Sequence, residues 1–546
     1  MDTNKGIIKG AMILAIASFI SRILGMIYKI PITNIIGDEG NAVYASAYNI
    51  YILIITFSAI GMPSAISKLV SERRAVGAFK EAHKVYHTAL IYSTILAFCL
   101  AGILFFGAEA IAKLMNNINL TMPLKALAPT TIVVTIMAVT RGYFQGMNHM
   151  MPTAISQVTE QFFNAMFSII LAYAFIDYGI IAAATGSTLG TGVGALVGLL
   201  VLSIIYFINR KKIRHTRSST SVYRNESGVL ILKRILMTII PIVLSTSIFS
   251  IMTNIDTMML NYYLPSIIDQ LVAQDMYSAI PVTGARYMDI RNIVDSLTGQ
   301  YLGKYLTIIN VPVSLILTIA MAAMPAISAS MAKKDYNDIK GKIKIVLKIG
   351  FLFAVPSAIG LTIFAGPIMN LLYRNVSDGK ELLIYGSVSI LFIATAQLTT
   401  GVLQGMGKQN IPTKNAFIAC IIKVVCNFVF LKFPVLNIYS VVHSTTICYI
   451  VYAALNINYL KNSLKIRLNW SSLILKPIYS GILMGAGSWG LFSILNWFYN
   501  IPNIWLLIVI GISAILYGII GILTGAITKD DLESIPGGKR FIKKFL

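Results

Sequence analysis

The feature that most constrains this chain is the recurrence of long apolar segments along its whole length. A helix that crosses a bilayer needs roughly 20 mostly apolar residues, and windows of that kind follow one another through all 546 residues. Apolar residues make up 56% of the chain and charged residues only 12%, whereas soluble domains carry about a quarter charged residues. A water-soluble fold could not bury that much apolar surface. The sequence therefore predicts an all-α integral membrane protein.

Polar, glycine and proline breaks divide the apolar sequence into about 14 predicted transmembrane helices. The first apolar run lacks a small-residue cleavage site and is too long for a signal peptide, so we interpret it as an uncleaved helix. The predicted spans lie near 7–30, 43–68, 86–107, 126–147, 152–176, 179–208, 230–257, 301–331, 343–366, 381–405, 412–433, 436–459, 471–497 and 501–526.

The basic residues predict the orientation of these spans. If the N-terminus lies inside, alternate segments that face the cytoplasm hold 32 Lys and Arg residues and the outer segments hold eight. Cytoplasmic loops of membrane proteins are enriched in Lys and Arg. We therefore expect a multi-pass protein of the cytoplasmic membrane with both termini inside. The net charge of +23 then reports orientation and contact with anionic membrane lipids, not a nucleic-acid partner.

An internal repeat divides the chain further. The sequence MPSAIS at 62–67 is echoed by MPAIS at 324–328, and GYFQGM at 142–147 is echoed by GVLQGM at 401–406. Ordered matches at a nearly constant offset indicate duplication of a six-helix unit. Because each unit contains an even number of spans, the copies share one orientation, which is the parallel repeat of alternating-access transporters.

The repeat predicts four parts of the chain. Two lobes of six helices would line the transport path between them, and two further helices would lie outside the repeat. The predicted parts are an N-lobe at 1–208, a basic cytoplasmic linker at 209–229, a C-lobe at 230–460, and the last two helices with a basic cytoplasmic tail at 461–546.

The first predicted span carries a polar stripe with two cations. Ser18, Arg22, Gly25 and Lys29 are spaced i, i+4, i+7 and i+11 and so share one helix face. Arg22 lies too deep to reach the inner surface easily, and a guanidinium at that depth costs about 2.5–3.5 kcal/mol even on the lenient insertion scale. Two interpretations stay open for Arg22: a structural salt bridge to another helix, or a cation that faces an anionic ligand.

Two further spans carry polar residues that we single out as candidates. Small polar residues often serve only as packing contacts between membrane helices. The carboxylates are different, since an unpaired carboxylate is disfavoured in hydrocarbon. Either carboxylate could pair with Arg22 or Lys29, or bind a proton or Na⁺. The candidates are Glu160, Gln161 and Asn164 in the span 152–176, and Asn254 and Asp256 in the span 230–257.

Tyrosines occupy the starts of two predicted spans. Tyr48 and Tyr51 belong to a stripe in the span 43–68, and Tyr305 follows Lys304 at the start of the span 301–331. Tyrosines near a membrane boundary are usually aromatic-belt anchors. The alternative is the lining of a cavity that binds a sugar or a headgroup.

The sequence contains no pattern typical of an enzyme or of a cofactor site. The only His pair spaced i, i+4, His83 and His87, has no acidic partner suited to zinc, and there is no P-loop. The longest outer loop, 258–300, is short for a glycosyltransferase, and we predict a solvated surface helix in it. We therefore expect a transporter without a cofactor, driven by the membrane potential, Na⁺ or H⁺.

Six motifs together resemble one family of exporters. The chain resembles the Gram-positive polysaccharide-transport branch of the multidrug/oligosaccharidyl-lipid/polysaccharide exporter superfamily, which includes the MurJ-type lipid II flippases and stage V sporulation protein B. The motifs are SRILG at 21–25, GDEG at 37–40, PSAISK at 63–68, RGYFQG at 141–146, SQVTEQ at 156–161 and NIDT at 254–257.

The resemblance implies 14 helices in two rocking lobes and a cavity that binds an undecaprenyl-pyrophosphate-linked precursor. Arg22 matches the first-helix arginine of the MurJ cavity. Tyr28, with Lys29 beside it, replaces the next cavity arginine, and Asn164 stands where the branch often has arginine. We thus expect a monomeric flippase for lipid II or a related lipid-linked oligosaccharide, with a role in the cell wall or in sporulation. The alternative is a cation-coupled multidrug exporter of the same superfamily.

Overall fold

The computed structural model describes residues 2–215, 226–499 and 502–528. Within these ranges every regular element is a helix, and there is no strand. Eleven helices, or twelve if the pair Lys380–Gly386 and Ser389–Gly405 with its 53° bend is one span, are long and apolar enough to cross a membrane. The prediction of an all-α, multi-pass membrane protein is therefore confirmed.

These helices do not correspond one to one to the fourteen predicted spans. The stretch Ile16–Ala75, which turns at Gly37, overlaps the predicted span 7–30 and contains the predicted span 43–68. Helix α9 (Gly228–Ala273) covers the predicted span 230–257 without being counted among the eleven. The count of fourteen stays a prediction. Residues 216–225 of the basic linker and 529–546 of the basic C-terminal tail lie outside the described residues.

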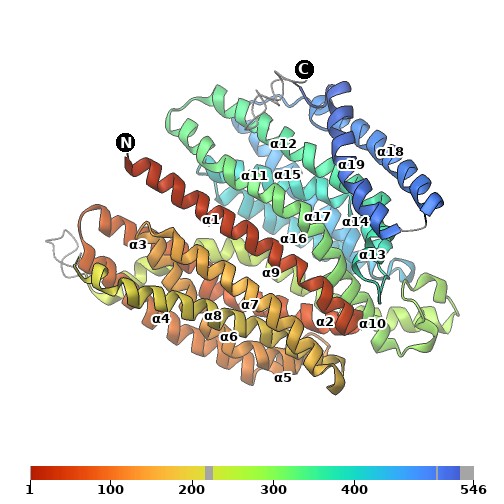
Figure 1. Cartoon of the computed structure of the whole chain (residues 1–546), viewed down its shortest axis with the longest axis horizontal. Helices are drawn as coiled ribbons and strands as arrows, with labels where there is room; N and C mark the ends of the chain where they lie inside the picture. The colour runs from red at the N-terminus through yellow and green to blue at the C-terminus, as the bar shows by residue number, and fades with distance from the viewer. Residues whose placement is uncertain (1, 216–225, 500–501, 529–546) are drawn as a thin grey trace. The chain divides into compact units, whose positions relative to one another are not determined.

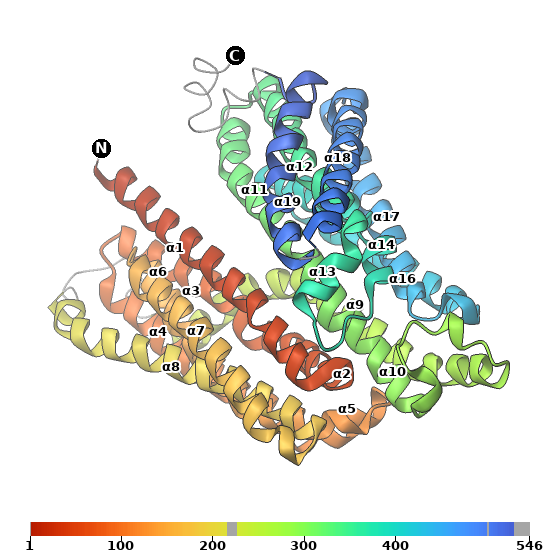
Figure 2. The same cartoon turned by 45° about the vertical axis from the view of Figure 1, so that its right-hand side comes forward.

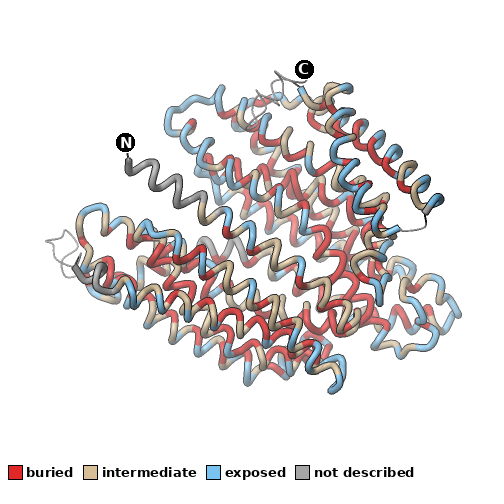
Figure 3. Tube along the Cα trace, viewed as in Figure 1, coloured by how far each residue is buried: buried red, intermediate tan, exposed pale blue. Residues whose placement is uncertain are grey.

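The chain folds as two compact units. The first unit is Met1–Pro265 with Asp289–Gly303, and buried residues run in stripes along its helices (Figure 3). Its elements are α1 (Asp2–Ile27), α2 (Lys29–Ile55), the π-helix η1 (Thr56–Ile60), α3 (Met62–Ala75), α4 (Phe79–Phe106), α5 (Ala108–Leu114), α6 (Thr121–Gly146), α7 (Met150–Phe175), α8 (Ile180–His215), α9 up to Pro265, and α10 (Ile290–Gly299) (Figure 1).

The second unit is Ser266–Met288 with Lys304–Leu546. Its last two long helices pack against each other as a pair (Figure 2). Its elements are the end of α9, α11 (Leu306–Ala332), α12 (Tyr336–Ile363), α13 (Ala365–Leu372), α14 (Lys380–Gly386), α15 (Ser389–Gly405), α16 (Asn410–Phe430), α17 (Tyr439–Leu464), α18 (Lys476–Tyr499) and α19 (Pro502–Leu523). The π-helix η6 (Gln300–Tyr305) carries the chain from one unit into the other.

This division differs from the lobe boundary expected near 209–229. Helix α9 belongs to the first unit up to Pro265, and so does α10, although both lie in the predicted C-lobe. The predicted four parts describe the repeat and the membrane topology, and they stay a prediction.

The internal repeat reappears as a repeated helix contact. In the first unit, Gly142 and Gly146 of α6 pack directly against α3, and in the second unit Gly401 and Gly405 of α15 pack in the same way against α11. A glycine pair spaced i, i+4 lets two membrane helices approach closely. The glycine pair of each copy therefore lets α6 pack closely on α3 and α15 pack closely on α11.

An equivalent hydrogen bond in each copy fixes the register between the two packed helices. The Ser71 hydroxyl donates to the Gly146 carbonyl at 3.1 Å, and the Ser328 hydroxyl donates to the Gly405 carbonyl at 2.7 Å. The sequence match aligns Ser328 with Ser67, which is one helical turn before Ser71. Helices α3 and α11 thus make equivalent contacts. The residues that make these contacts differ by one helical turn from the residues that the sequence match aligns.

Candidate functional site

Two polar helix faces meet in the first unit. Helix α1 packs along α7 (Figure 1). The Ser18 hydroxyl donates to Oε1 of Gln157 at 3.4 Å, and Gly25 leaves room for the side-chain amide of Gln161. These contacts place the face that also carries Arg22 toward α7. We call the set Ser18, Arg22, Lys29, Gln157 and Gln161 the polar stripe.

The backbone keeps Lys29 on the same face as Arg22. Tyr28 joins α1 to α2 with helical angles (φ −68°, ψ −21°), so the helix continues through Lys29. The chain turns only at Gly37, whose φ of 68° lies in the left-handed region that favours glycine. The stripe predicted from spacing therefore exists as one surface.

Neither cation of the polar stripe has an anionic partner in the part of the chain that the structure describes. Arg22 and Lys29 are half-buried, and among the described residues neither side chain forms a hydrogen bond or an ion pair. The nearest aromatic contact of Lys29 is the ring of Tyr48, whose centroid lies 5.9 Å from Nζ. An uncompensated cation within a membrane protein is costly, and it attracts an anion or water. The structural salt bridge considered for Arg22 is absent from the described part of the chain.

Tyrosines of α2 adjoin the polar stripe. The hydroxyls of Tyr28 and Tyr44 lie 2.9 Å apart, and the ring of Tyr48 stacks on Tyr44 with centroids 6.0 Å apart. The ring of Tyr51 follows at 5.9 Å from Tyr48. Tyr44 and Tyr51 are each only 2% exposed, so they are packed inside the unit and do not form a lipid-facing aromatic belt. Tyr48 is half-buried and stays a candidate for ligand contact.

Glu160 pairs with Arg141 and not with either cation of the stripe. Its Oε2 lies 2.7 Å from Nη2 of Arg141, which also donates to Ser156 at 2.8 Å. This partner was missed in the sequence, where Arg141 is one of the few basic residues within a span. The signal that could have found it is that α6 and α7 are consecutive helices and each carries one charge at depth. The pair neutralises Glu160 beside Tyr48 and Tyr51.

Asn164 takes part in helix packing. Its Oδ1 accepts from the Ser168 hydroxyl at 2.9 Å, and Gly194 of α8 packs against its Cβ. Its side chain also contacts the Tyr28 hydroxyl. Asn164 thus lies next to Tyr28. Its side chain is used in contacts that hold α7 against α8 and against the start of α2.

Asn254 and Asp256 hold α9 within the first unit. The Asn254 amide donates to the carbonyl of Asn49 at 3.1 Å, which joins α9 to α2. Asp256 is 2% exposed, and its carboxylate accepts from the Tyr301 hydroxyl at 3.5 Å. The structure does not bring either side chain into contact with Arg22 or Lys29. Their contacts favour a role in positioning helices.

Lys304 belongs to the second unit, and its ammonium group has hydrogen-bond partners there. Its ammonium donates to the carbonyls of Val376 at 2.6 Å and Asp378 at 3.1 Å, and it lies 5.4 Å from the ring centroid of Tyr373. Lys304 and Tyr305 are buried, so the aromatic-belt interpretation does not hold here. Lys304 anchors the loop between α13 and α14, and it is not part of the polar stripe.

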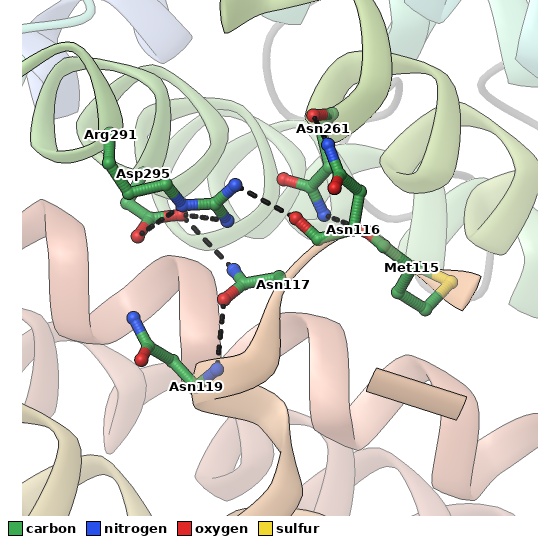
Figure 4. A network of polar contacts seen from close by, with 7 residues as sticks. All are labelled: Met115, Asn116, Asn117, Asn119, Asn261, Arg291 and Asp295. Atoms are coloured by element: carbon green, nitrogen blue, oxygen red, sulfur yellow. Dashed lines mark hydrogen bonds and ion pairs between the residues drawn. The ribbon is translucent and has the colours of Figure 1, made fainter. Parts of the chain in front are cut away.

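The predicted surface helix of the long outer loop is a packed helix. Asp295 of α10 is 4% exposed and forms an ion pair with Arg291 at 2.9 Å. Asn117 donates to Asp295 at 3.1 Å, and Arg291 donates to the Asn116 carbonyl at 2.8 Å (Figure 4). Gly299 permits close approach to the backbone of α2. The prediction of a helix here is correct. The prediction that the helix is solvated is wrong, because its charged side chains contact other parts of the first unit.

A sequence model described as "Polysaccharide biosynthesis protein" matches residues 7–331. The chain belongs to this family. A second model, "Lipid II flippase MurJ", matches residues 296–516. The resemblance drawn from the six motifs is therefore confirmed, and the expectation of a membrane transporter instead of an enzyme agrees with these matches.

Individual relatives agree with the family assignment. Stage V sporulation protein B of Bacillus subtilis (strain 168) is 25% identical over 544 residues, which cover 97% of each chain. The lipid II flippase MurJ of the same organism is 26% identical over 443 residues, covering 78% of this chain and 77% of MurJ. A solved structure of lipid II flippase MurJ in an inward closed conformation shares the fold, with a TM-score of 0.67, 18% identity and coverage of 93% and 98% of the two chains.

Proposed function

We propose that this protein is a flippase that moves an undecaprenyl-pyrophosphate-linked cell-wall precursor, lipid II or a related lipid-linked oligosaccharide, across the cytoplasmic membrane. The observation that carries the proposal is the pair of uncompensated cations, Arg22 and Lys29, on one polar helix face. The family and the named relatives support the substrate class. Transport would follow alternating access, with no covalent chemistry.

The two cations suit a pyrophosphate. A guanidinium binds phosphate oxygens through paired, charge-assisted hydrogen bonds, and an ammonium adds a second point charge. Both interactions are stronger in a low-dielectric site than in water. The amides of Gln157 and Gln161 and the hydroxyl of Tyr48 would bind the neutral groups next to the phosphates.

The pairing of Glu160 favours a flippase over an exporter of cationic drugs. A cation-coupled drug exporter needs a carboxylate that is available to the drug, Na⁺ or H⁺. Here the Glu160 carboxylate is 2.7 Å from Arg141 and is neutralised by it. Arg22 and Lys29 would also repel a cationic drug. The charge balance of the stripe therefore matches an anionic substrate.

The proposal includes the setting of the protein. The split of basic residues between alternate segments favours the cytoplasmic membrane of a Gram-positive-type bacterium, with both termini inside. The energy would come from the membrane potential or from a Na⁺ or H⁺ gradient. The protein would act as a monomer and contact only its lipid-linked substrate and membrane lipids.

A reconstituted translocation assay tests the proposal. The full-length protein in vesicles should move fluorescent lipid II to the far leaflet and should leave a cationic dye in place. The double variant R22A/K29A should slow translocation by at least about tenfold, since each lost charge-assisted contact is worth roughly 1.5–3 kcal/mol. R22K should retain part of the rate. Lys113 is an exposed cation paired with Glu109, so K113A is the matched control and should be unchanged.

Two results would contradict the proposal. One is lipid II translocation by R22A/K29A at the rate of the unaltered protein. The other is transport of the cationic dye together with no movement of lipid II, which would favour the drug-exporter alternative. Thermal unfolding of each variant in detergent must match the unaltered protein for either result to count.

A further inference from the structure

A cavity lies within the second unit, and no residue of the polar stripe contributes to it. Its volume is about 590 Å³, within the roughly 300–1,000 Å³ typical of small-molecule sites. The loop at 280–283, α13, the start of α14, α18 and α19 form its walls. These segments belong to the side of the protein that the basic residues predict to be outer.

Three side-chain amides from three helices line this cavity. They are Asn370 of α13, Asn496 of α18 and Asn503 of α19. None of the three amide side chains forms a hydrogen bond with a described residue, and Oδ1 of Asn496 is buried without a partner. An amide can donate two hydrogen bonds and accept two. The cavity therefore offers convergent donors and acceptors that no described residue uses.

Each charged residue of the cavity wall has a polar or charged partner. The Asp378 carboxylate accepts from the Thr283 backbone amide at 2.7 Å and from its hydroxyl at 2.6 Å, while Lys304 holds the Asp378 carbonyl. Nζ of Lys380 lies 3.8 Å from Oε1 of Glu381. The lining holds one cation, Lys380, against the two carboxylates of Asp378 and Glu381, so the cavity does not match a phosphate. It favours a ligand that is polar and neutral.

One wall of the cavity is apolar. Phe492 lines it and is held by Phe364 and Trp489, with ring centroids 5.7 Å and 5.8 Å from its own. Phe492 is 6% exposed, so it gives the cavity a small aromatic surface. An aromatic surface beside several amides suits a sugar ring, which presents C–H groups on its faces and hydroxyls around its edge. Acetamido groups would add one donor and one acceptor for each sugar.

We propose that this cavity binds a neutral, N-acetylated saccharide. The asparagine amides would bind hydroxyl and acetamido groups, and Phe492 would contact one face of a ring. The same chemistry is found in the headgroup of a lipid-linked oligosaccharide and in a free cell-wall glycan. Only the first of these two sources rests on the proposed flippase function.

Saturation-transfer NMR on the full-length protein in lipid nanodiscs tests the proposal. The probe is N,N′-diacetylchitobiose, with cellobiose as the comparison lacking acetamido groups. We expect transfer to diacetylchitobiose and weaker transfer to cellobiose. N370L and N496L should each weaken binding by roughly three- to tenfold, as expected for a lost hydrogen bond. The milder N496S should have a smaller effect in the same direction. The exposed Asn462 of α17 supplies the control N462L, which should bind normally.

The outcomes separate the site from its source and from the flippase proposal. Displacement of diacetylchitobiose by lipid II supports the cavity as a site for the cargo headgroup, and persistence of the bound disaccharide supports a free glycan as its ligand. Binding that is equal in N370L, N496L and the unaltered protein overturns the proposal, as does the absence of binding of any saccharide. Lipid II translocation is measured in parallel. If only the flippase proposal were wrong, translocation would be absent while the saccharide still bound to the cavity.

Discussion

The side chain of Arg73 on α3 is completely buried and depends on Glu226, which lies between α8 and α9. Glu226 also pairs with Arg234 at 2.9 Å, and its carbonyl accepts from Lys84. E226Q would leave Arg73 buried without a counter-charge. We expect a loss of about 3–5 kcal/mol of unfolding free energy, as for other buried pairs that lose one partner.

Thermal unfolding of E226Q in detergent measures this effect. The control is E109Q, because the pair of Glu109 and Lys113 is more than 60% exposed on both sides, and exposed pairs contribute roughly 0–1 kcal/mol. A midpoint for E226Q equal to that of E109Q would mean that the buried Arg73 does not depend on the charge of Glu226.

The ion pair of Arg141 and Glu160 allows a double-mutant test. E160Q should destabilise the fold by about 1–3 kcal/mol, because Arg141 would lose its charged acceptor. R141Q should have a similar effect, and R141Q/E160Q should recover part of the loss, since two neutral amides can bond each other. Unfolding midpoints of the four proteins give the coupling energy. Strict additivity of the two single changes would show that the pair is not coupled.

At the scale of single residues, the sequence predicts the cations but not their neighbours. The spacing of Ser18, Arg22 and Lys29 places them on one helix face, because helical periodicity is local. The partner of Glu160 is decided by how α6 packs on α7, which spacing within one helix does not encode. The same is true of Lys304, whose carbonyl partners lie more than 70 residues further along the chain.

At the scale of helices, the glycine pairs of α6 and α15 make a testable contact. A Cβ on Gly146 would lie 2.6 Å from Cβ of Val70, and one on Gly405 would lie 2.8 Å from the Met324 carbonyl oxygen. G146A and G405A should therefore separate the helices or strain them, with a loss of about 1–3 kcal/mol typical of overpacking. Unfolding in detergent and the yield of folded protein measure the loss.

Gly102 of α4 supplies the matched control for these two glycines. A Cβ at Gly102 meets nothing within 4 Å, and alanine is the better helix former by about 1 kcal/mol. G102A should be neutral or stabilising. Stabilities of G146A and G405A equal to that of G102A would show that close helix approach at these two positions is not needed.

The repeat shows how far a sequence match predicts helix packing. Matching sequences correctly indicate two copies of one helical arrangement. They do not give the register, because Ser71 makes the contact that the match would assign to Ser67. The contacts of a helix depend on the small residues of the helix that it faces. The sequence match compares each helix only with its repeat copy, so it contains no information on the facing helix. The burial of α10 is hidden for the same reason, since its partners lie on α2 and in the loop before α6.

At the scale of the whole molecule, the orientation in the membrane can be tested at two positions. Tyr287, which is 91% exposed, precedes α10, and the exposed Lys333 follows α11. In a variant without native cysteines, Y287C should react with a membrane-impermeant maleimide in intact cells. K333C should react only after the cells are permeabilised, because the basic residues after α11 should stay inside.

The labelling pattern decides more than orientation. Reaction of both cysteines from one side would mean that the chain between them does not cross the bilayer, which would contradict the candidate span Ile290–Ala332. The reverse pattern would place the cavity lined by Asn370 and Asn496 on the cytoplasmic side. A saccharide site there would meet the precursor before transport and not after it. The expected pattern agrees with a pyrophosphate site at Arg22 of α1 and Lys29 of α2, and with a sugar site at the outer cavity.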